Sequence, residues 1–316
     1  MMIEGQEGVT WEQWMDLARV CEARGFQGLF RSDHYLSFDR PRERGTLDAW
    51  ATLAGLAAVT ERIRLGTMVS PVTFRHPSVL AKSVATVDHI SGGRVELGMG
   101  AGWFEREHEA FGFVFPPDGE RMNLLAEHVE IVHRLWDRSE DAVTFEGVHY
   151  RLDAVRSLPV PMQEPHPPLI LGGGAGPRAA ALAARWADEY DVVSVGPGEA
   201  RSARARLSEA CGAIGRDPRS LRMSLMTGVV VAADRSQLER RMASVMDREG
   251  ESGDVGDALE RWRAEGIAGT VDEALQRLAE YAEAGVDRIL MQHLVHEDLE
   301  MLELIGTEIV PRAADL

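Results

Sequence analysis

One histidine with an adjacent acid has the side chains needed to move a proton. Asp33 and His34 directly follow Gln27–Phe30, a short apolar run that predicts a buried strand. Histidine titrates near neutrality, and a neighbouring carboxylate can accept hydrogen bonds. A polar loop that only caps the next helix would have the same composition. Both interpretations of Asp33-His34 remain open on local sequence alone.

Two glycine-rich segments have the composition of ligand-binding loops. One contains Gly98, Gly100 and Gly102, and the other runs from Gly172 to Pro177 and leads into a predicted helix. Glycine has no Cβ, so the backbone can approach a flat ligand or a phosphate closely. The start of a helix also presents free N–H groups and the positive end of its dipole. Four glycines in five positions exceed what a tight turn needs, so the second segment predicts a phosphate site.

Two Glu-x-x-His pairs raise a metal alternative. Glu105 with His108 and Glu130 with His133 have the spacing by which helical bundles hold two iron ions. Such a site needs four long facing helices and two further glutamates, whereas these pairs lie among alternating strands and helices. The chain has two cysteines, far apart and without a C-x-x-C motif. We therefore expect neither a metal site nor a disulfide.

The elements that must position these residues alternate between short apolar runs and longer amphipathic runs. This pattern is typical of a parallel sheet with crossover helices. The eight predicted strands are Met2–Glu4, Gln27–Phe30, Ile63–Val69, Val95–Met99, Leu169–Leu171, Val192–Val195, Leu225–Val231 and Arg288–Met291. A count of eight favours a closed (β/α)8 TIM barrel over an open doubly wound sheet, which has the same alternation. Ligand chemistry is then expected in the loops that follow the strands.

Predicted helices lie between these strands, and two segments exceed the simple repeat. The helices are expected near residues 11–24, 47–60, 77–90, 121–137, 177–186, 200–214, 236–249, 271–284 and 299–309. Thr10 with Gln13, and Thr270 with Glu273, form capping boxes that mark two helix starts. Residues 142–155 predict a small hairpin, and residues 233–269 a charged helical insertion. Neither is expected to be a separate domain, so residues 1–316 are predicted to form one. The first strand is short, and whether it is complete stays open.

Composition excludes several classes of protein. The chain has 316 residues, of which 45% are hydrophobic and 27% charged, as in an ordinary soluble domain. Its formal net charge of −17 repels phosphodiester backbones, and no basic run is present, so nucleic-acid binding is not expected. No apolar run approaches the ~20 residues of a membrane span, and no leader opens the chain, so we expect a cytoplasmic protein. Leu47–Thr60 is apolar enough to pair two copies as a homodimer, or simply to pack on the barrel.

Several motifs together resemble the luciferase-like monooxygenase superfamily over nearly the whole chain. They are Ser32-Asp33-His34, Gly66-Thr67-Met68-Val69, residues 76–82, residues 88–94, Gly98-x-Gly100-Ala101-Gly102-Trp103 and residues 183–189. The Ser-Gly-Gly-Arg turn before the glycine loop, and the later Ala-Asp-Glu, are most similar to the F420-dependent branch. The resemblance implies a barrel that exchanges hydride between the deazaflavin coenzyme F420 and a small substrate. A monooxygenase using FMN and oxygen is the alternative, and a non-catalytic cofactor-binding barrel is a third.

The resemblance also implies roles for individual residues. His34 would donate or accept a proton, and Asp33 would lie beside the redox ring. A cis peptide at Met68-Val69 would lie behind the ring. The ring and its side chain would run along Gly100, Ala101 and Gly102, and the phosphate would bind to Gly172, Gly173 and Gly174. Trp103 replaces the catalytic glutamate that glucose-6-phosphate dehydrogenases of this branch carry at that position. We therefore expect another substrate. Glu105, the candidate acid, and Glu107 lie nearby, and Glu7 falls near an acidic mouth residue of relatives, so the acid is either supplied differently or absent. The motifs do not name that substrate.

Overall fold

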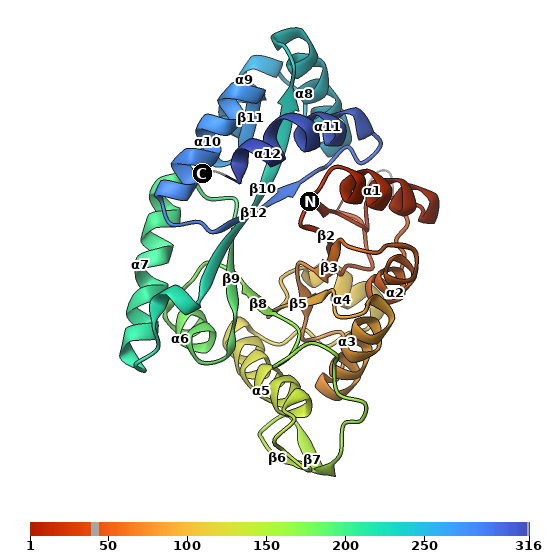
Figure 1. Ribbon diagram of the computed structural model, residues 1–316, viewed down its shortest axis with the longest axis vertical. Coiled ribbons are helices and arrows are strands. Elements are labelled where there is room, and N and C mark those ends of the chain that lie inside the picture. Colours follow the sequence, from red (N-terminus) through yellow and green to blue (C-terminus); the bar gives the residue numbers. More distant parts are fainter. Residues whose placement is uncertain (39–43, 315) are drawn as a thin grey trace.

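Eight parallel strands close into a barrel in the computed structural model, which describes residues 1–38, 44–314 and 316 (Figure 1). In order around the barrel they are β1 (Met2–Ile3), β2 (Gly28–Arg31), β3 (Arg64–Thr67), β5 (Val95–Gly100), β8 (Leu169–Gly172), β9 (Glu189–Val193), β10 (Arg222–Ala232) and β12 (Arg288–Gln292). Pairing of β9 with β10, and of β12 with β1, completes the ring. The expected closed barrel is thus confirmed over an open sheet.

Helices surround the barrel, and the two helix starts predicted from capping boxes are confirmed. The helices are α1 (Trp11–Ala23), α2 (Ala49–Val59), α3 (Pro77–Ser91), α4 (Glu105–Phe111), α5 (Asp118–Trp136), α6 (Pro177–Trp186), α7 (Pro197–Ala213), α10 (Val271–Glu283), α11 (Leu299–Leu304) and α12 (Val310–Ala313). Before α1, the N–H of Thr10 donates to the Gln13 side chain at 2.8 Å, and before α10 the N–H of Thr270 donates to Glu273 at 2.8 Å. These bonds satisfy N–H groups that would otherwise lack partners at the helix ends. No helix in the described part of the chain is long and apolar enough to cross a membrane.

Side chains fill the interior of the barrel below its mouth. At one level the Arg288 guanidinium donates to Glu96 at 2.8 Å and to Glu189 at 2.7 Å, and all three side chains are largely buried. The guanidinium also lies 5.1 Å from the centre of the Phe30 ring. The neighbouring level is apolar and consists of Met2, Phe30, Met68, Ile170 and Leu290, with Val69 and Met226 packed against it.

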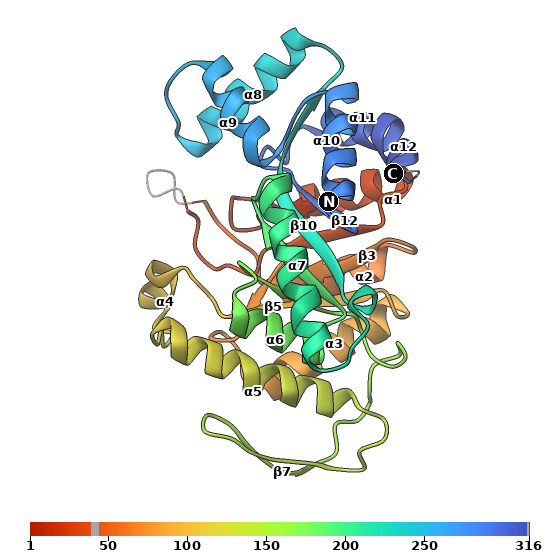
Figure 2. The ribbon, with the colours of Figure 1, turned by 90° about the vertical axis from the view of Figure 1, so that its left-hand side faces the viewer.

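Two additions lie at opposite ends of the molecule (Figures 1 and 2). The predicted hairpin is present as the antiparallel pair β6 (Val143–Glu146) and β7 (Arg151–Val155). The predicted insertion contains α8 (Arg235–Glu249) and α9 (Val255–Glu265), but also β11 (Ile267–Thr270), which pairs in parallel with the end of β10. This strand was not predicted because its four residues run directly into the capping box of α10.

One predicted strand is wrong in position. The sixth barrel strand, β9, begins at Glu189 and ends at Val193, whereas the apolar run suggested Val192–Val195. Glu189 and Asp191 are buried inside the barrel, so acids occupy positions where a strand pattern leads one to expect apolar side chains. The error matters because Asp191 belongs to the cavity described below.

Candidate active site

A cavity of about 650 Å³ opens at the carboxyl ends of the strands. Barrels of this type bind their ligands there. Nine of the predicted site residues line it: His34, Met68, Val69, Gly100, Ala101, Gly102, Gly172, Gly173 and Gly174. They come from loops and strand ends that are far apart in sequence, and closure of the barrel brings them together.

His34 forms a close pair with an acid from α4. Its Nδ1 lies 2.8 Å from Oε2 of Glu107, and the other carboxylate oxygen accepts the backbone N–H groups of Tyr35 and Leu36, the latter at 2.9 Å. Glu107 therefore holds both the ring and the loop that carries it. No residue in 1–38, 44–314 or 316 bonds the other ring nitrogen, Nε2. The arrangement leaves Nε2 as the atom of His34 able to exchange a proton with a ligand.

Electrostatics favour the protonated form of this histidine. The side chain is only 10% exposed. Burial by itself lowers the pKa of His34, but the hydrogen bond and the negative charge of Glu107 outweigh burial and raise that pKa above its ordinary value. A pair of this kind can hold a proton near neutral pH and release it to a partner of suitable basicity.

Aromatic rings form a wall beside His34. Its ring centre lies 5.1 Å from that of Phe38, 5.8 Å from that of Trp103 and 6.0 Å from that of Phe104. The Trp103 side chain is 63% exposed although it lines the cavity. A large apolar ring so open to solvent is placed to cover a ligand rather than to complete the core.

Val69 explains several of the glycines. The Met68-Val69 peptide is cis, as predicted. A Cβ on Gly100 would lie 2.6 Å from one methyl carbon of Val69, and a Cβ on Gly172 would lie 3.2 Å from the other. Carbon atoms normally approach to ~3.5–4.0 Å. Glycine at these positions therefore makes room for the Val69 side chain, in addition to any ligand.

The predicted phosphate cradle is only partly free to bind. The N–H of Gly173 donates to the Asp191 carbonyl at 3.0 Å, and the N–H of Ala175 donates to the Tyr190 hydroxyl at 2.9 Å. Gly174 is exposed, and a Cβ there would meet nothing within 4 Å. The α6 helix begins directly afterwards with no side chain capping it. Gly174 and the first turn of α6 are thus the part of the cradle that faces open space.

Two predicted residues do not line the cavity. Asp33 is buried, and its Oδ2 accepts hydrogen bonds from Ser70 at 2.6 Å and from Arg75 at 2.5 Å. Arg75 also binds Tyr35 and Asp48, so Asp33 ties the His34 loop to the neighbouring strands. Glu105 is exposed at the start of α4. The acid that meets His34 is Glu107, two residues further along.

Sequence patterns missed several polar residues of the cavity wall, among them Glu4, Asp191, Ser194 and Gln292. Glu4 accepts a hydrogen bond from Gln6 at 2.8 Å and another from Gln292. These residues lie at the ends of strands, outside the motifs used above. The signal that could have found Asp191 is the two-residue period of β9, which places Glu189, Asp191 and Val193 on one face.

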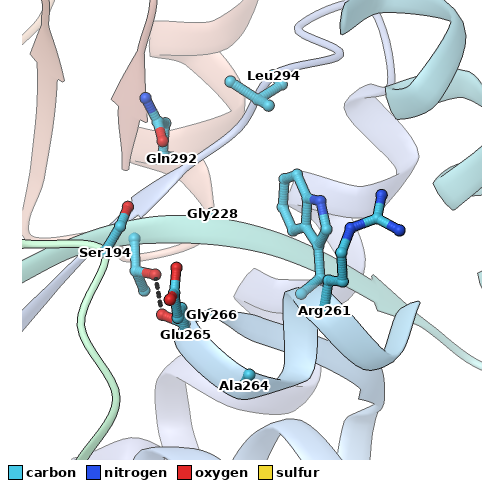
Figure 3. Close-up of a pocket in the computed structure, with 10 residues that line it drawn as sticks. Ser194, Gly228, Arg261, Ala264, Glu265, Gly266, Gln292 and Leu294 are labelled. Carbon is cyan, nitrogen blue, oxygen red and sulfur yellow. Dashed lines mark hydrogen bonds between the residues drawn. The ribbon is translucent and has the colours of Figure 1, made fainter. Parts of the chain in front are cut away.

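A second hollow of about 450 Å³ adjoins the cavity, because Ser194 and Gln292 line both (Figure 3). The Trp262 ring lies against Gly228, where a Cβ would come within 2.4 Å of it. Thr227 donates to the Glu265 carbonyl at 2.7 Å and ties the end of α9 to β10. Residues of the helical insertion thus extend the mouth beyond the main cavity. Among residues 1–38, 44–314 and 316, no group of three or more His, Cys, Asp or Glu side chains could hold a metal ion.

The barrel and its mouth site are those of a TIM-barrel oxidoreductase. The chain matches the luciferase-like monooxygenase family over residues 2–288 and belongs to that family. An F420-dependent glucose-6-phosphate dehydrogenase of Nakamurella multipartita is 30% identical, over 94% of this chain and 91% of that protein. One from Microbacterium testaceum is 28% identical, over 94% and 92%.

Solved structures agree with this fold. The monooxygenase RslO1 from Streptomyces bottropensis is 25% identical with a TM-score of 0.83, covering 99% of both chains. The coenzyme F420 dependent tetrahydromethanopterin reductase from Methanopyrus kandleri is 22% identical with a TM-score of 0.80, covering 99% of this chain and 98% of that one. At that identity the reductase supports the fold alone. The resemblance expected from the sequence motifs is confirmed at the level of the family.

Proposed function

We propose that this protein is an F420-dependent oxidoreductase that transfers hydride between the deazaflavin and a small organic substrate. The observation that carries the proposal is the His34–Glu107 pair, which faces a cavity large enough for a flat ring. F420 dependence of relatives 30% and 28% identical supports the choice of cofactor. F420 would supply the hydride chemistry when bound.

The residues present fit such a cofactor. Met68 and Val69 form one wall of the cavity, and Gly100, Ala101 and Gly102 another. Gly174 and the start of α6 offer N–H groups to a phosphate. His34 would move the proton that accompanies hydride transfer, with Glu107 fixing its ring, and Trp103 would help exclude water.

Binding and turnover test the proposal. Purified protein is titrated with F420 and separately with FMN, and micromolar binding of F420 alone is expected. His34→Ala should then cut turnover by roughly 10²–10⁴-fold with little change in F420 binding, as for loss of a general acid or base. Unchanged turnover would remove His34 from the mechanism.

One observation favours a second candidate, an FMN-dependent monooxygenase. The 25% identical RslO1 is described as a monooxygenase. Product formation that requires oxygen and FMN would decide for this candidate. Tight cofactor binding without turnover on a panel of alcohols, imines and enones would instead indicate a non-catalytic barrel.

Trp103 stands where the resemblance places a glutamate in sugar-phosphate dehydrogenases, so glucose 6-phosphate is expected to be a poor substrate.

A further inference from the structure

Asp191 on β9 is a buried acid that the chemistry above does not use. It is 1% exposed and lines the floor of the main cavity. Its Oδ1 accepts a hydrogen bond from the Ser224 hydroxyl at 2.9 Å. Its Oδ2 is buried and has no hydrogen-bond partner within the described ranges. Buried polar atoms almost always find a partner, so an orphaned carboxyl oxygen on a cavity wall points to a ligand group that is absent here.

The surroundings of Asp191 favour its neutral form. Burial raises its pKa to about 8, and the negative charge of Glu189 acts in the same direction. Ser224, Arg288 and the nearby backbone N–H of Met226, which makes no hydrogen bond of normal geometry to Oδ2, oppose this shift only in part. Glu4, His34 and Tyr190 are the other titratable groups of the same cavity wall. Near neutral pH the side chain is therefore a carboxylic acid.

The position of the proton follows from the contact with Ser224. Because Oδ1 accepts the Ser224 hydroxyl, the acid proton belongs on Oδ2, the oxygen without a partner. A protonated carboxyl oxygen donates a hydrogen bond. None of the described residues supplies a hydrogen-bond partner for Oδ2. The missing partner is thus a hydrogen-bond acceptor on a ligand.

Barrel topology says which end of a ligand Asp191 would meet. His34 follows β2, and β2 and β9 are four places apart in the ring of eight strands. The two side chains therefore stand on opposite sides of the mouth. Gly172, which pairs with Asp191, is also the glycine that accommodates Val69. A flat ring lying against Val69 would have its reacting edge near His34 and its far end near Asp191.

We propose that the Asp191 carboxyl group donates a hydrogen bond to a carbonyl oxygen of the pyrimidinedione ring of the bound cofactor. The inference rests on the proposed function. Deazaflavin and flavin share this ring, so the same contact serves F420 or FMN. Asp191 would be a binding group at the end of the ring away from hydride transfer, and no proton leaves it during the reaction.

Two substitutions separate hydrogen bonding from shape and charge. Asp191→Asn keeps a donor but cannot ionise, and Asp191→Leu keeps the branched shape, with larger methyl groups, but removes the donor. Asp88→Asn is the matched control, because Asp88 is also fully buried but accepts its hydrogen bonds from Met162 and Gln163, outside the cavity. Thermal unfolding checks that each variant is folded, and Asp191→Leu should be at least as stable as the parent because it removes a buried polar group.

Dissociation constants are measured by ultrafiltration, with the free cofactor quantified after adjustment to a single pH. At pH 7, Asp191→Leu should bind F420 about 10-fold more weakly, as for loss of one buried hydrogen bond, while the Asn variant and the control stay near the parent. Above pH 8 the parent should lose affinity relative to Asp191→Asn, since an ionised carboxylate repels a carbonyl oxygen. Any ionisation of the cofactor itself affects both proteins and cancels in this ratio.

The outcomes distinguish this inference from the proposed function. Equal affinity of parent and Asp191→Leu, with a parent-to-Asn ratio that is flat with pH, would overturn the role of Asp191 and leave F420 dependence intact. If the parent binds FMN but not F420, F420 dependence fails, and the same variants measured with FMN decide the role of Asp191. A parent that binds neither cofactor overturns both.

Discussion

Replacing Gly100 by alanine tests whether the glycines of the mouth exist for the ligand or for Val69. The new Cβ would lie 2.6 Å from one methyl carbon of Val69, and among the described residues other than its chain neighbours it would otherwise meet only the Val69 Cβ, at 3.8 Å. Overpacking of this kind typically costs ~1–3 kcal/mol. Val69 is partly buried, so Val69→Ala alone should cost about 1 kcal/mol through lost apolar burial.

The double variant, Gly100→Ala with Val69→Ala, measures the coupling free energy between the two positions. Val69→Ala removes the atom that Gly100→Ala would strike, so the combined loss should be smaller than the sum of the single losses by ~1–2 kcal/mol. Urea unfolding of the four proteins, followed by fluorescence and extrapolated linearly, measures this coupling. Gly174→Ala is the control, since a Cβ there meets nothing within 4 Å, and its stability should change by less than ~0.5 kcal/mol.

Strictly additive losses would refute the packing explanation for Gly100. A Gly100→Ala variant that is as stable as the parent but has lost cofactor affinity would show instead that the ligand itself requires the glycine. F420 titration of the same four proteins, run beside the unfolding measurements, separates these two results. Weaker binding by Gly174→Ala at unchanged stability would support the predicted phosphate site at the start of α6.

Three further predictions concern charged groups. Glu107→Gln should lower the pKa of His34 and shift the corresponding limb of the pH–rate profile to lower pH. Because Glu107 raises that pKa, the stability that the pair contributes is present below the ordinary histidine pKa of ~6.5 and is lost as pH rises through the pKa of the folded protein. An NMR titration of His34 that does not shift in the variant would contradict this. Burial raises the pKa of Asp191 in the folded protein to about 8, so the free energy of unfolding of the parent should fall as pH rises from ~4 to about 8, by up to ~1.4 kcal/mol per pH unit. Urea unfolding at several pH values should show that Asp191→Asn removes this pH dependence. Arg288→Met should lower stability by ~3–5 kcal/mol, because it leaves buried Glu189 without its closest cation, and a loss below ~1 kcal/mol would show that the ion pair contributes little.

The fold was largely accessible from the sequence, because its signals are local. Alternating apolar runs count the strands, and capping residues such as Thr10 and Thr270 fix where helices begin. The exceptions are strands whose pattern is not apolar. Glu189 and Asp191 face the barrel interior, so the run of hydrophobic residues that identifies a strand starts too late at this position.

The residues of the candidate site likewise fall into those that the local sequence predicts and those that only the packing reveals. The glycine-rich loops and the histidine that follows a strand can be recognised in the sequence, and they locate the mouth of the barrel. Which acid meets His34 is not visible, since Glu105, Glu107 and Glu109 alternate along a helix of seven residues. Only the packing of α4 against the His34 loop places Glu107 inward and leaves Glu105 in solvent. Asp33, adjacent to His34 in sequence, turns instead to Arg75.

His34 and Asp191, on opposite walls of the mouth, are placed for different roles. The His34 ring, fixed by Glu107, has one nitrogen free to exchange a proton, whereas the neutral Asp191 carboxyl can only hold a ligand in place. In the proposed roles neither side chain would distinguish one substrate from another, because both would contact the cofactor or the transferred proton. Substrate choice must therefore come from the rim, where Trp103 is open to solvent and the hollow beside Trp262 extends the cavity. Substitutions at Trp103 or Trp262 should alter KM among substrates more than F420 affinity, and the reverse pattern would place the cofactor, not the substrate, against those rings.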